Sequence, residues 1–575
     1  MWRIKFLFFA IVVVGFLIIA RLFFWQVLSQ DKLQARAEQQ HWFIREIGAS
    51  RGEIFDRNGA KLVGNDLAFL VYANLPALVE SQKAEIARVL APVVYQGNEA
   101  TASAVDLPAS KNFQEEILAK LNQSNLIWVP LARKISQQSK KTIESYNFDG
   151  INFEQDNQRF YPEASMAAQL LGFVGSDQDG RDRGYFGLEG FYHQDLKGKP
   201  GEVQQERDAR GRPILIGGYK IGQAEDGRNL QLYLDRTIQY FAEKHLAAGV
   251  LRYGAKSGSV VVVDPQTGGI LAMASYPAYD PLNFTKYPAV LYKNPLVADT
   301  YEPGSTFKVF IMSAALQESL VKPDTICPIC HGPKKIGEYA VRTWDNKYRA
   351  NSTMADVIIH SDNVGMTHVA DLLGLDRLYK YIENFGFGQL TGIDLQDEAA
   401  AQLRPKSDWY PIDVATASFG QGVAVTAIQM VSAVSTLANG GKLMEPHVVE
   451  KIIGRDKTIE IKPKIIRQIL RPETTKQVTE IMVQAVEKGE AKWTRLSGFR
   501  IAGKTGTAQI PIAGHYDPKK TIASFVGFAP ADQARFVMLV RYDEPTSSPY
   551  GAETAAPTFF AIARDILGYL NIAPQ

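Results

Sequence analysis

Several familiar signals are missing from this chain of 575 residues, and each absence narrows what it does. The formal net charge is only +2, which argues against a basic surface and against nucleic acid as a partner. His-Glu-x-x-His does not occur, so the sequence lacks the motif of zinc peptidases. There is no internal repeat and no low-complexity segment, which excludes solenoid and array architectures.

Cysteine is nearly absent, and both cysteines fall in "CPICH", which ends at His331. The string matches the pattern of covalent c-type haem attachment. Two cysteines and one histidine are one ligand short of a tetrahedral zinc site. Haem, transient metal binding and a structural loop with a disulfide therefore remain open, and the last is favoured. We expect Cys327 and Cys330 to have a structural role, with no metal and no cofactor.

Long apolar runs are also scarce, because only "FLFFAIVVVGFLIIARLFFWQVL", Phe6 to Leu28, reaches the length of a membrane span. As a helix it would extend about 34 Å, enough for a bilayer core of roughly 30 Å. The alternative is a cleaved signal peptide, whose apolar region would be shorter. Arg3 and Lys5 precede the run and predict a cytoplasmic N-terminus. We therefore expect a single-pass protein of the cytoplasmic (inner) membrane with everything after Leu28 outside the cytoplasm.

The remaining chain divides by changes of pattern. We predict a tail and anchor over residues 1–29, a non-catalytic domain over 30–227 and a catalytic domain over 228–575. The second boundary follows a stretch rich in glycine and charge, which is typical of exposed turns.

Strand signals lie at both ends of the third region. "SGSVVVVDPQTGGILAMASYP" predicts a hairpin, and "TIASFVGFAP" followed by "RFVMLVRYD" predicts a second strand pair. Helical patterns lie between them, and "APTFFAIARDILGYL" predicts a last apolar helix. The expected fold class is α+β, with an antiparallel sheet flanked by helices.

A serine and a lysine stand three positions apart in "YEPGSTFKVF". The Pro-Gly entry and the apolar run after Lys308 predict a helix that begins near Ser305, with both side chains on one face. A serine becomes nucleophilic through a neighbouring base, and a lysine serves only if burial or positive charge lowers its pKa. The same spacing starts at Ser29 and at Ser319, so alone it also fits a capping or solvated serine.

Two later motifs distinguish Ser305 from the other two serines. Ser361-Asp362-Asn363 and Lys504-Thr505-Gly506 follow it in order within the same predicted domain. Ser-x-x-Lys, Ser-Asp-Asn and Lys-Thr-Gly together are the signature of class A β-lactamases and penicillin-binding proteins.

The chain resembles the membrane-anchored class B penicillin-binding proteins, which are D,D-transpeptidases of bacterial peptidoglycan, over nearly its whole length. "RGEIFDRNG", "RFYPEASMAAQLLGFVG" and "GLEGFYHQDLKGKPG" are similar to segments of that family's non-catalytic pedestal domain. "EPGSTFK", "SDNVG", "SFGQGVAVTAIQM" and "GKTGTA" resemble its penicillin-binding, serine β-lactamase-like transpeptidase domain. The insertion-like "CPICHGPKKIGEYAVRTWDN" departs from the family pattern, and the resemblance gives it no role.

The resemblance also implies roles for four catalytic residues. Ser305 would attack the penultimate D-Ala of a donor stem peptide ending in D-Ala-D-Ala and form an acyl-enzyme. Lys308 would be the base for that step. Ser361 would relay a proton toward the leaving amine, and Lys504 would sustain the positive field that keeps Lys308 neutral.

Substrate-binding roles follow from the same resemblance. Asn363 would hold a backbone amide of the peptide, and the strand with Gly506 would be an edge on which the peptide lies. The backbone N–H groups of Ser305 and Thr507 would form the oxyanion hole. The hydroxyls of Thr505 and Thr507 would bind the terminal carboxylate.

The implied partners are peptidoglycan stem peptides, β-lactam antibiotics and a multi-spanning glycosyltransferase within a cell-wall assembly complex. Three alternatives stay open: a D,D-carboxypeptidase, a β-lactam sensor and a structural protein of cell-wall assembly. With no appendage expected after the last helix, the length favours the division-type member over the elongation type.

Overall fold

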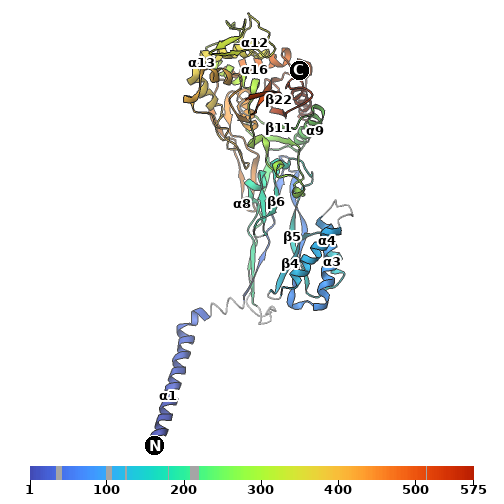
Figure 1. Cartoon of the computed structure of the whole chain (residues 1–575), viewed down its shortest axis with the longest axis vertical. Coiled ribbons are helices and arrows are strands. Elements are labelled where there is room, and N and C mark those ends of the chain that lie inside the picture. The colour runs from blue at the N-terminus through green and yellow to red at the C-terminus, as the bar shows by residue number, and fades with distance from the viewer. Residues whose placement is uncertain are drawn as a thin grey trace. The chain divides into compact units, whose positions relative to one another are not determined.

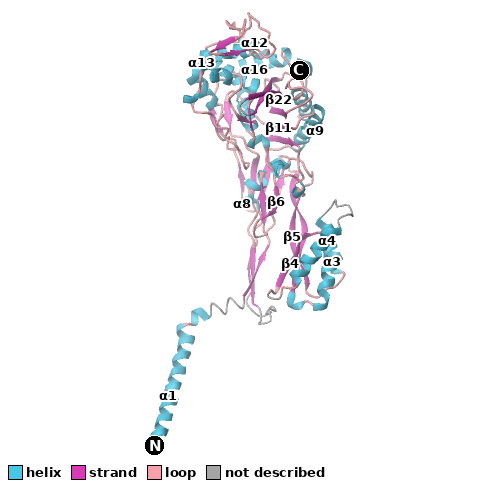
Figure 2. Cartoon of the chain, in the orientation of Figure 1, coloured by secondary structure: helices cyan, strands magenta, loops and turns pink. Residues whose placement is uncertain are grey.

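The computed structural model describes residues 1–33, 42–98, 107–123, 126–178, 180–206, 219–512 and 515–574 (Figure 1). The chain forms two compact units, Met1–Arg51 with Lys197–Gly227, and Gly52–Leu196 with Arg228–Gln575. Part of the glycine- and charge-rich stretch, residues 207–218, lies outside the described residues. Figure 2 shows the mixture of helices and strands expected of an α+β chain.

The first unit contains the apolar helix and a small sheet. Helix α1 spans Trp2–Phe23 and continues as a π-helical turn, Phe24–Leu28. In the part of the chain that the structure describes, Trp2–Leu28 is the one helix long and apolar enough to cross a membrane. The sheet has the order β1-β8-β9, with β1 at Trp42–Ile47, β8 at Gly201–Glu206 and β9 at Tyr219–Gly222.

The second unit is centred on a five-stranded antiparallel sheet of order β12-β11-β23-β22-β21. Its strands are β11 (Ser257–Val263), β12 (Ile270–Tyr276), β21 (Ala502–Ile512), β22 (His515–Ala529) and β23 (Phe536–Asp543). Both predicted strand pairs are confirmed, since β11 pairs with β12 and β22 pairs with β23. Strand β21 is left at one edge of the sheet.

Helices cover both faces of this sheet, which explains the unbroken valine run of β11. Successive side chains of a strand point to opposite faces, so each face needs its own apolar residues. Val260 and Val262 pack in the core formed with α9 (Arg236–Tyr253) and α17 (Ala555–Tyr569). Val261 and Val263 pack in the opposite core, which contains these helices: α11 (Lys308–Gln317), α12 (Met354–Ile359), α13 (Asn363–Asn384), α15 (Ala427–Ala438) and α16 (Pro472–Lys488).

A seven-stranded sheet joins the two predicted extracytoplasmic regions within the second unit. Its order is β19-β18-β10-β2-β3-β4, with β5 paired to β3. Strands β2 to β5 precede residue 227 and the others follow it: β2 (Ile54–Phe55), β3 (Lys61–Asn74), β4 (Trp128–Ile135), β5 (Ile151–Phe160), β10 (Asn229–Leu232), β18 (Val449–Ile453) and β19 (Thr458–Glu460). Residues on both sides of 227 therefore share one hydrogen-bonded sheet.

Smaller elements complete the unit. Helices α3 (Lys83–Asn98), α4 (Leu107–Leu121) and α5 (Gln137–Glu144) contact one another or β3 and β4. Four two-stranded sheets pair β6 (Phe173–Ser176) with β7 (Asp182–Tyr185), β13 (Thr300–Tyr301) with β16 (Val425–Thr426), β14 (Lys334–Ile336) with β15 (Tyr339–Val341), and β17 (Lys442–Met444) with β20 (Ile465–Gln468). The remaining short helices are α6 (Ala168–Leu171), α7 (Gly187–Phe191), α8 (His193–Leu196), α10 (Pro295–Ala298) and α14 (Pro411–Ala417).

A buried ion pair connects the three sequence segments assigned to the pedestal. Arg159 Nε lies 2.7 Å from Glu189 Oε1, and the two side chains are 5% and 0% exposed. Arg159 also donates to the carbonyl oxygen of Gly52 at 2.7 Å and to Asn65 Oδ1 at 2.8 Å. A buried guanidinium needs this many acceptors because water is excluded from it. The pair fixes the packing of β5, α7 and the segment before β2.

Replacing only one partner of this pair should destabilise the second unit. Arg159→Met removes the guanidinium that lies against the buried Glu189 carboxylate, and we expect the free energy of unfolding to fall by about 3–5 kcal/mol. Arg159→Met with Glu189→Leu should recover part of that loss. Urea unfolding followed by circular dichroism measures both; a single variant as stable as the wild type would contradict the prediction.

Candidate active site

Ser305 lies at the start of the helix that the sequence predicted. A 3-10 turn, Gly304–Phe307, leads directly into α11. The Ser305 side chain caps neither element and is half-exposed, whereas Thr306, Phe307 and Lys308 behind it are buried. A Cβ at Gly304, where φ is +57°, would lie 2.9 Å from the carbonyl oxygen of Thr507, so a glycine is needed for this turn to approach β21.

Lys308 is fully buried and surrounded by three oxygen atoms. Its Nζ lies 2.6 Å from the carbonyl oxygen of Ser361, 2.7 Å from Asn363 Oδ1 and 3.1 Å from Ser361 Oγ. The first two oxygens can only accept, whereas the hydroxyl can donate. A neutral amine satisfies all three, with two N–H groups donated to the acceptors and its lone pair facing the Ser361 hydroxyl.

The electrostatic surroundings favour that neutral form. Burial is the largest cause, and the positive charge of Lys504 adds to it, so that the pKa of Lys308 lies well below its usual value. The charges of Glu490 and Asp362 oppose the shift more weakly. A lowered pKa increases the fraction of deprotonated amine, which is the form able to act as a base.

Ser361 connects Ser305 to Lys308. The Ser361 and Ser305 hydroxyl oxygens lie 2.9 Å apart, and among the described residues no hydrogen bond joins Ser305 to Lys308 directly. If Ser361 donates to Lys308, it accepts from Ser305, and this gives a continuous path for the Ser305 proton. The motif spacing suggested a direct contact between serine and lysine; the structure places Ser361 between them.

The backbone around Ser361 is set by two helix ends. Ser361 has φ of +57° and occupies the link between α12 and α13, a conformation that costs a residue with a side chain roughly 1–2 kcal/mol. Asp362 caps α13, because its Oδ1 accepts from the backbone N–H groups of Val364 at 2.8 Å and Gly365 at 3.1 Å. The middle residue of Ser-Asp-Asn is therefore a cap, and it positions the residues on either side.

Both polar atoms of the Asn363 side-chain amide already form hydrogen bonds within the chain. Its Oδ1 accepts from Lys308, and its Nδ2 donates to the carbonyl oxygen of Arg342 at 3.1 Å. Arg342 follows β15 in the insertion-like segment, to which the sequence assigned no role. The Asn363 donor expected to bind substrate thus faces a carbonyl of the chain itself, a contact that no sequence pattern indicated.

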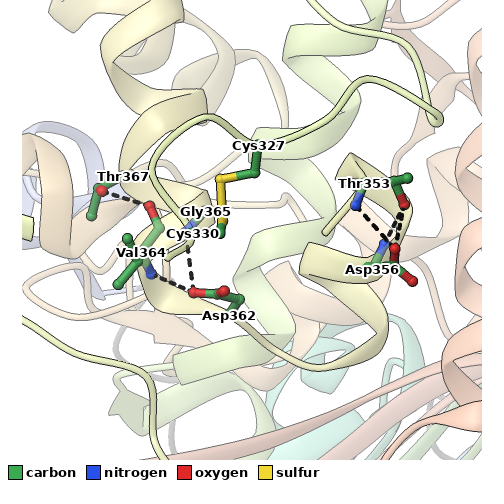
Figure 3. The surroundings of a disulfide bond; sticks show 8 residues. All are labelled: Cys327, Cys330, Thr353, Asp356, Asp362, Val364, Gly365 and Thr367. Atoms are coloured by element: carbon green, nitrogen blue, oxygen red, sulfur yellow. Dashed lines mark hydrogen bonds between the residues drawn. A yellow bond between two sulfur atoms is a disulfide. The ribbon is translucent and has the colours of Figure 1, made fainter. Parts of the chain in front are cut away.

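The same insertion contains a disulfide between Cys327 and Cys330, both fully buried (Figure 3). The disulfide packs against the first turn of α13, where a Cβ at Gly365 would lie 3.1 Å from the Cys330 sulfur. Because each sulfur is bonded to the other, neither is available for a haem thioether or as a thiolate ligand. The predicted structural disulfide is what the structure contains, and it supports the loop that carries Ser361.

Strand β21 brings the third motif to the site at one edge of the five-stranded sheet. A Cβ at Gly506 would lie 2.8 Å from the Thr306 methyl group and 3.1 Å from the Pro303 carbonyl oxygen. The strand can therefore pass closely beside the Ser305 turn only with glycine at this position. Lys504 is buried, and burial lowers the pKa of its amine.

The two threonine hydroxyls of β21 have different partners. Thr507 Oγ1 accepts from the backbone N–H of Gly551 at 3.1 Å. Thr505 Oγ1 accepts from Lys504 Nζ at 3.0 Å and donates to Glu490 Oε2 at 2.9 Å. Glu490 is half-buried just after α16, and no sequence pattern singled it out.

Comparison with known families agrees with this geometry. A profile described as "Penicillin binding protein transpeptidase domain" matches residues 258–568. A second, described as "Penicillin-binding Protein dimerisation domain", matches residues 46–232. The first range contains Ser305, Ser361 and Lys504, and the two profiles together account for most of the chain.

Individual proteins resemble the chain over almost its full length. "Stage V sporulation protein D" of Bacillus subtilis is 34% identical and covers 98% of this chain and 85% of its own. "Peptidoglycan D,D-transpeptidase FtsI" of Escherichia coli is 28% identical over 100% of this chain and 93% of its own. The crystal structure of penicillin binding protein 2X from Streptococcus thermophilus superposes with a TM-score of 0.73 at 24% identity. The superposition covers 92% of this chain and 80% of that one. The last similarity identifies the fold.

Removing the Asp362 cap should destabilise the fold without changing its core. Asp362→Ala leaves the N–H groups of Val364 and Gly365 without their acceptor, and we expect a loss of about 1 kcal/mol in the free energy of unfolding. Asp362→Asn keeps a capping oxygen and is the matched control. Thermal unfolding measures both; equal stability of Asp362→Ala and Asp362→Asn would contradict the capping role.

Proposed function

The chain belongs to the penicillin-binding protein transpeptidase family, and from this membership we propose that it is a peptidoglycan D,D-transpeptidase with Ser305 as its nucleophile. The observation that carries the proposal is the chain of hydrogen bonds from Ser305 through Ser361 to the buried amine of Lys308. A serine that is only solvated or caps a helix does not require a buried lysine connected to it by two hydrogen bonds. An acyl-transfer nucleophile requires such a base.

In the proposed reaction, Ser305 Oγ attacks the carbonyl carbon of the penultimate D-Ala in a donor stem peptide. The Ser305 proton passes through Ser361 to Lys308, and the bond to the terminal D-Ala breaks as its amine gains a proton by the reverse path. The product is an ester between Ser305 and the shortened stem. Attack by an amine of a neighbouring stem then forms the cross-link and releases Ser305. A β-lactam enters the same first step and leaves a long-lived ester.

Backbone donors and positive charge stabilise the negative charge that develops on the carbonyl oxygen. The backbone N–H groups of Ser305 and Thr507 form the proposed oxyanion hole, for which the close approach of Gly304 to β21 is suited. The start of α11 adds the positive end of a helix dipole. Lys504 supplies positive charge and lowers the pKa of Lys308, which keeps that base neutral.

The edge position of β21 suits an extended peptide ligand. A stem peptide can add to that edge as a further strand. The sequence assigned the hydroxyls of Thr505 and Thr507 to the substrate carboxylate; of the two, Thr505 already donates its proton to Glu490, and Thr507 keeps the proposed role. Asn363 is the proposed ligand for a peptide amide. For Asn363 to donate to substrate, its Nδ2 must first leave the Arg342 carbonyl oxygen.

The proposed setting is the outer face of the cytoplasmic membrane. Trp2–Leu28 is the anchor, and Arg3 and Lys5 before it favour a cytoplasmic N-terminus. We keep residues 30–227 as the proposed pedestal and 228–575 as the catalytic domain. Glycan strands are supplied by a multi-spanning glycosyltransferase as partner, and the division-type role stays a prediction.

Labelling with a fluorescent penicillin tests the nucleophile. We expect the wild-type chain to form a covalent adduct that survives a denaturing gel, and Ser305→Ala to reduce labelling by roughly 1,000-fold or more. Ser319→Ala is the matched control, because Ser319 begins another Ser-x-x-Lys spacing but is exposed at the end of α11. Labelling that persists in Ser305→Ala would overturn the acyl-enzyme proposal.

The pH dependence of acylation tests Lys308 as the base. Because the neutral amine is the active form, the acylation rate should fall as pH drops through the lowered pKa of Lys308. Lys504→Gln removes one of the two causes that lower this pKa, so the midpoint should move to higher pH. Lys488→Gln, an exposed lysine on α16, is the control. An unchanged midpoint in Lys504→Gln would contradict the assignment.

A further inference from the structure

Glu490 places a carboxylate beside the strand that is proposed to bind the substrate carboxylate. It follows α16 (Pro472–Lys488), and its Oε2 accepts from the Thr505 hydroxyl at 2.9 Å. Thr505 Oγ1 in turn accepts from Lys504 Nζ at 3.0 Å. Glu490, Thr505 and Lys504 thus form one connected set on the edge strand, and neither the motifs nor the family profiles give Glu490 a role.

The one hydrogen-bond donor of the Thr505 side chain is used within this set. A threonine hydroxyl has a single proton to donate. Thr505 gives that proton to Glu490, so it has none to offer to an incoming carboxylate. Thr507 differs, because its hydroxyl oxygen accepts from Gly551 N and its proton takes part in no hydrogen bond among the described residues.

The negative charge of Glu490 also disfavours a ligand carboxylate beside Thr505. The Glu490 carboxylate is half-buried, so its repulsion of a second carboxylate is screened less than at an exposed site. Its field reaches the site, since it opposes the lowering of the pKa of both Lys504 and Lys308. The other charged groups that act on Lys308 are Lys504 on β21 and Asp362 between α12 and α13.

We propose that Glu490 is a specificity-determining positioning residue that withholds the Thr505 hydroxyl from ligand carboxylates and leaves their recognition to Thr507 and Lys504. The consequence is a site that favours carboxylate-bearing ligands less strongly than its two threonines and one lysine would otherwise allow. This inference rests on the proposed acyl transfer at Ser305.

A ligand pair that differs only in charge tests the proposal. The second-order rate constant of acylation is measured for benzylpenicillin and for its methyl ester, with the full-length chain in detergent. In Glu490→Gln we expect the carboxylate-to-ester ratio of rate constants to rise roughly three- to tenfold, because a repelling charge is lost and the neutral amide oxygen holds the Thr505 proton less strongly than the carboxylate does. Glu490→Ala, which also removes the acceptor, should change the ratio in the same direction.

The matched control is Glu487→Gln, which removes the same charge from an exposed position on α16. Its ratio should equal that of the wild type. If Glu490 acts through the hydroxyl, the effect of Glu490→Gln should shrink severalfold in a Thr505→Val background, as a double-mutant cycle measures. Thermal unfolding of each variant separates these effects from loss of fold.

A pH profile supplies a readout that a structural role would not change. Removing the negative charge lowers the pKa of Lys308 further, so with the ester the acid limb of acylation in Glu490→Gln should move to lower pH. A ratio that is unchanged or reduced in both Glu490 variants would overturn the inference. Failure of the wild-type chain to acylate at Ser305 would instead overturn the proposed function, so the two failures are distinguishable.

Discussion

The fully buried amine of Lys308 is the constraint on which the catalytic site depends. Burying a lysine side chain without water is unfavourable for its charged form, and the shifted pKa is the result. The amine still needs hydrogen-bond partners. These are the carbonyl and hydroxyl of Ser361 and the side-chain amide of Asn363, all from the short link between α12 and α13 and the residue that begins α13. The left-handed backbone at Ser361 is the conformation in which that link is held.

Much of the fold was predictable because its signals are local. The strand pairs β11–β12 and β22–β23, the start of the nucleophile helix and the last helix follow from apolar periodicity, turn residues and a Pro-Gly entry. The sequence motifs also identified the residues that meet at Ser305. Their spacing did not reveal that Ser361 stands between Ser305 and Lys308, because that depends on how two helices pack.

The contacts that sequence reasoning missed are all long-range and involve groups without a pattern. Glu490 reaches Thr505 from a loop after α16, and one glutamate in a loop looks like any other. Arg342 contributes a backbone carbonyl to Asn363, which its side-chain identity does not encode. The predicted division at residue 227 was based on composition, whereas the seven-stranded sheet includes strands from both sides of it. Pairing between strands that are distant in the chain leaves little trace in the sequence of either strand.

That shared sheet also sets an order of events for a chain made from its N-terminus. Strand β2 needs β10 as its parallel neighbour, and β10 needs β18 at Val449–Ile453 to cover its other edge. Until those late residues have emerged, β10 presents an open edge, which is the kind of surface on which partly folded chains associate. The early segments can therefore complete their sheet only after most of the catalytic region has been delivered. Synthesis that stalls between Asn363 and β18 would leave an intermediate prone to aggregation, even though Ser305, Lys308 and Ser361 had already been made.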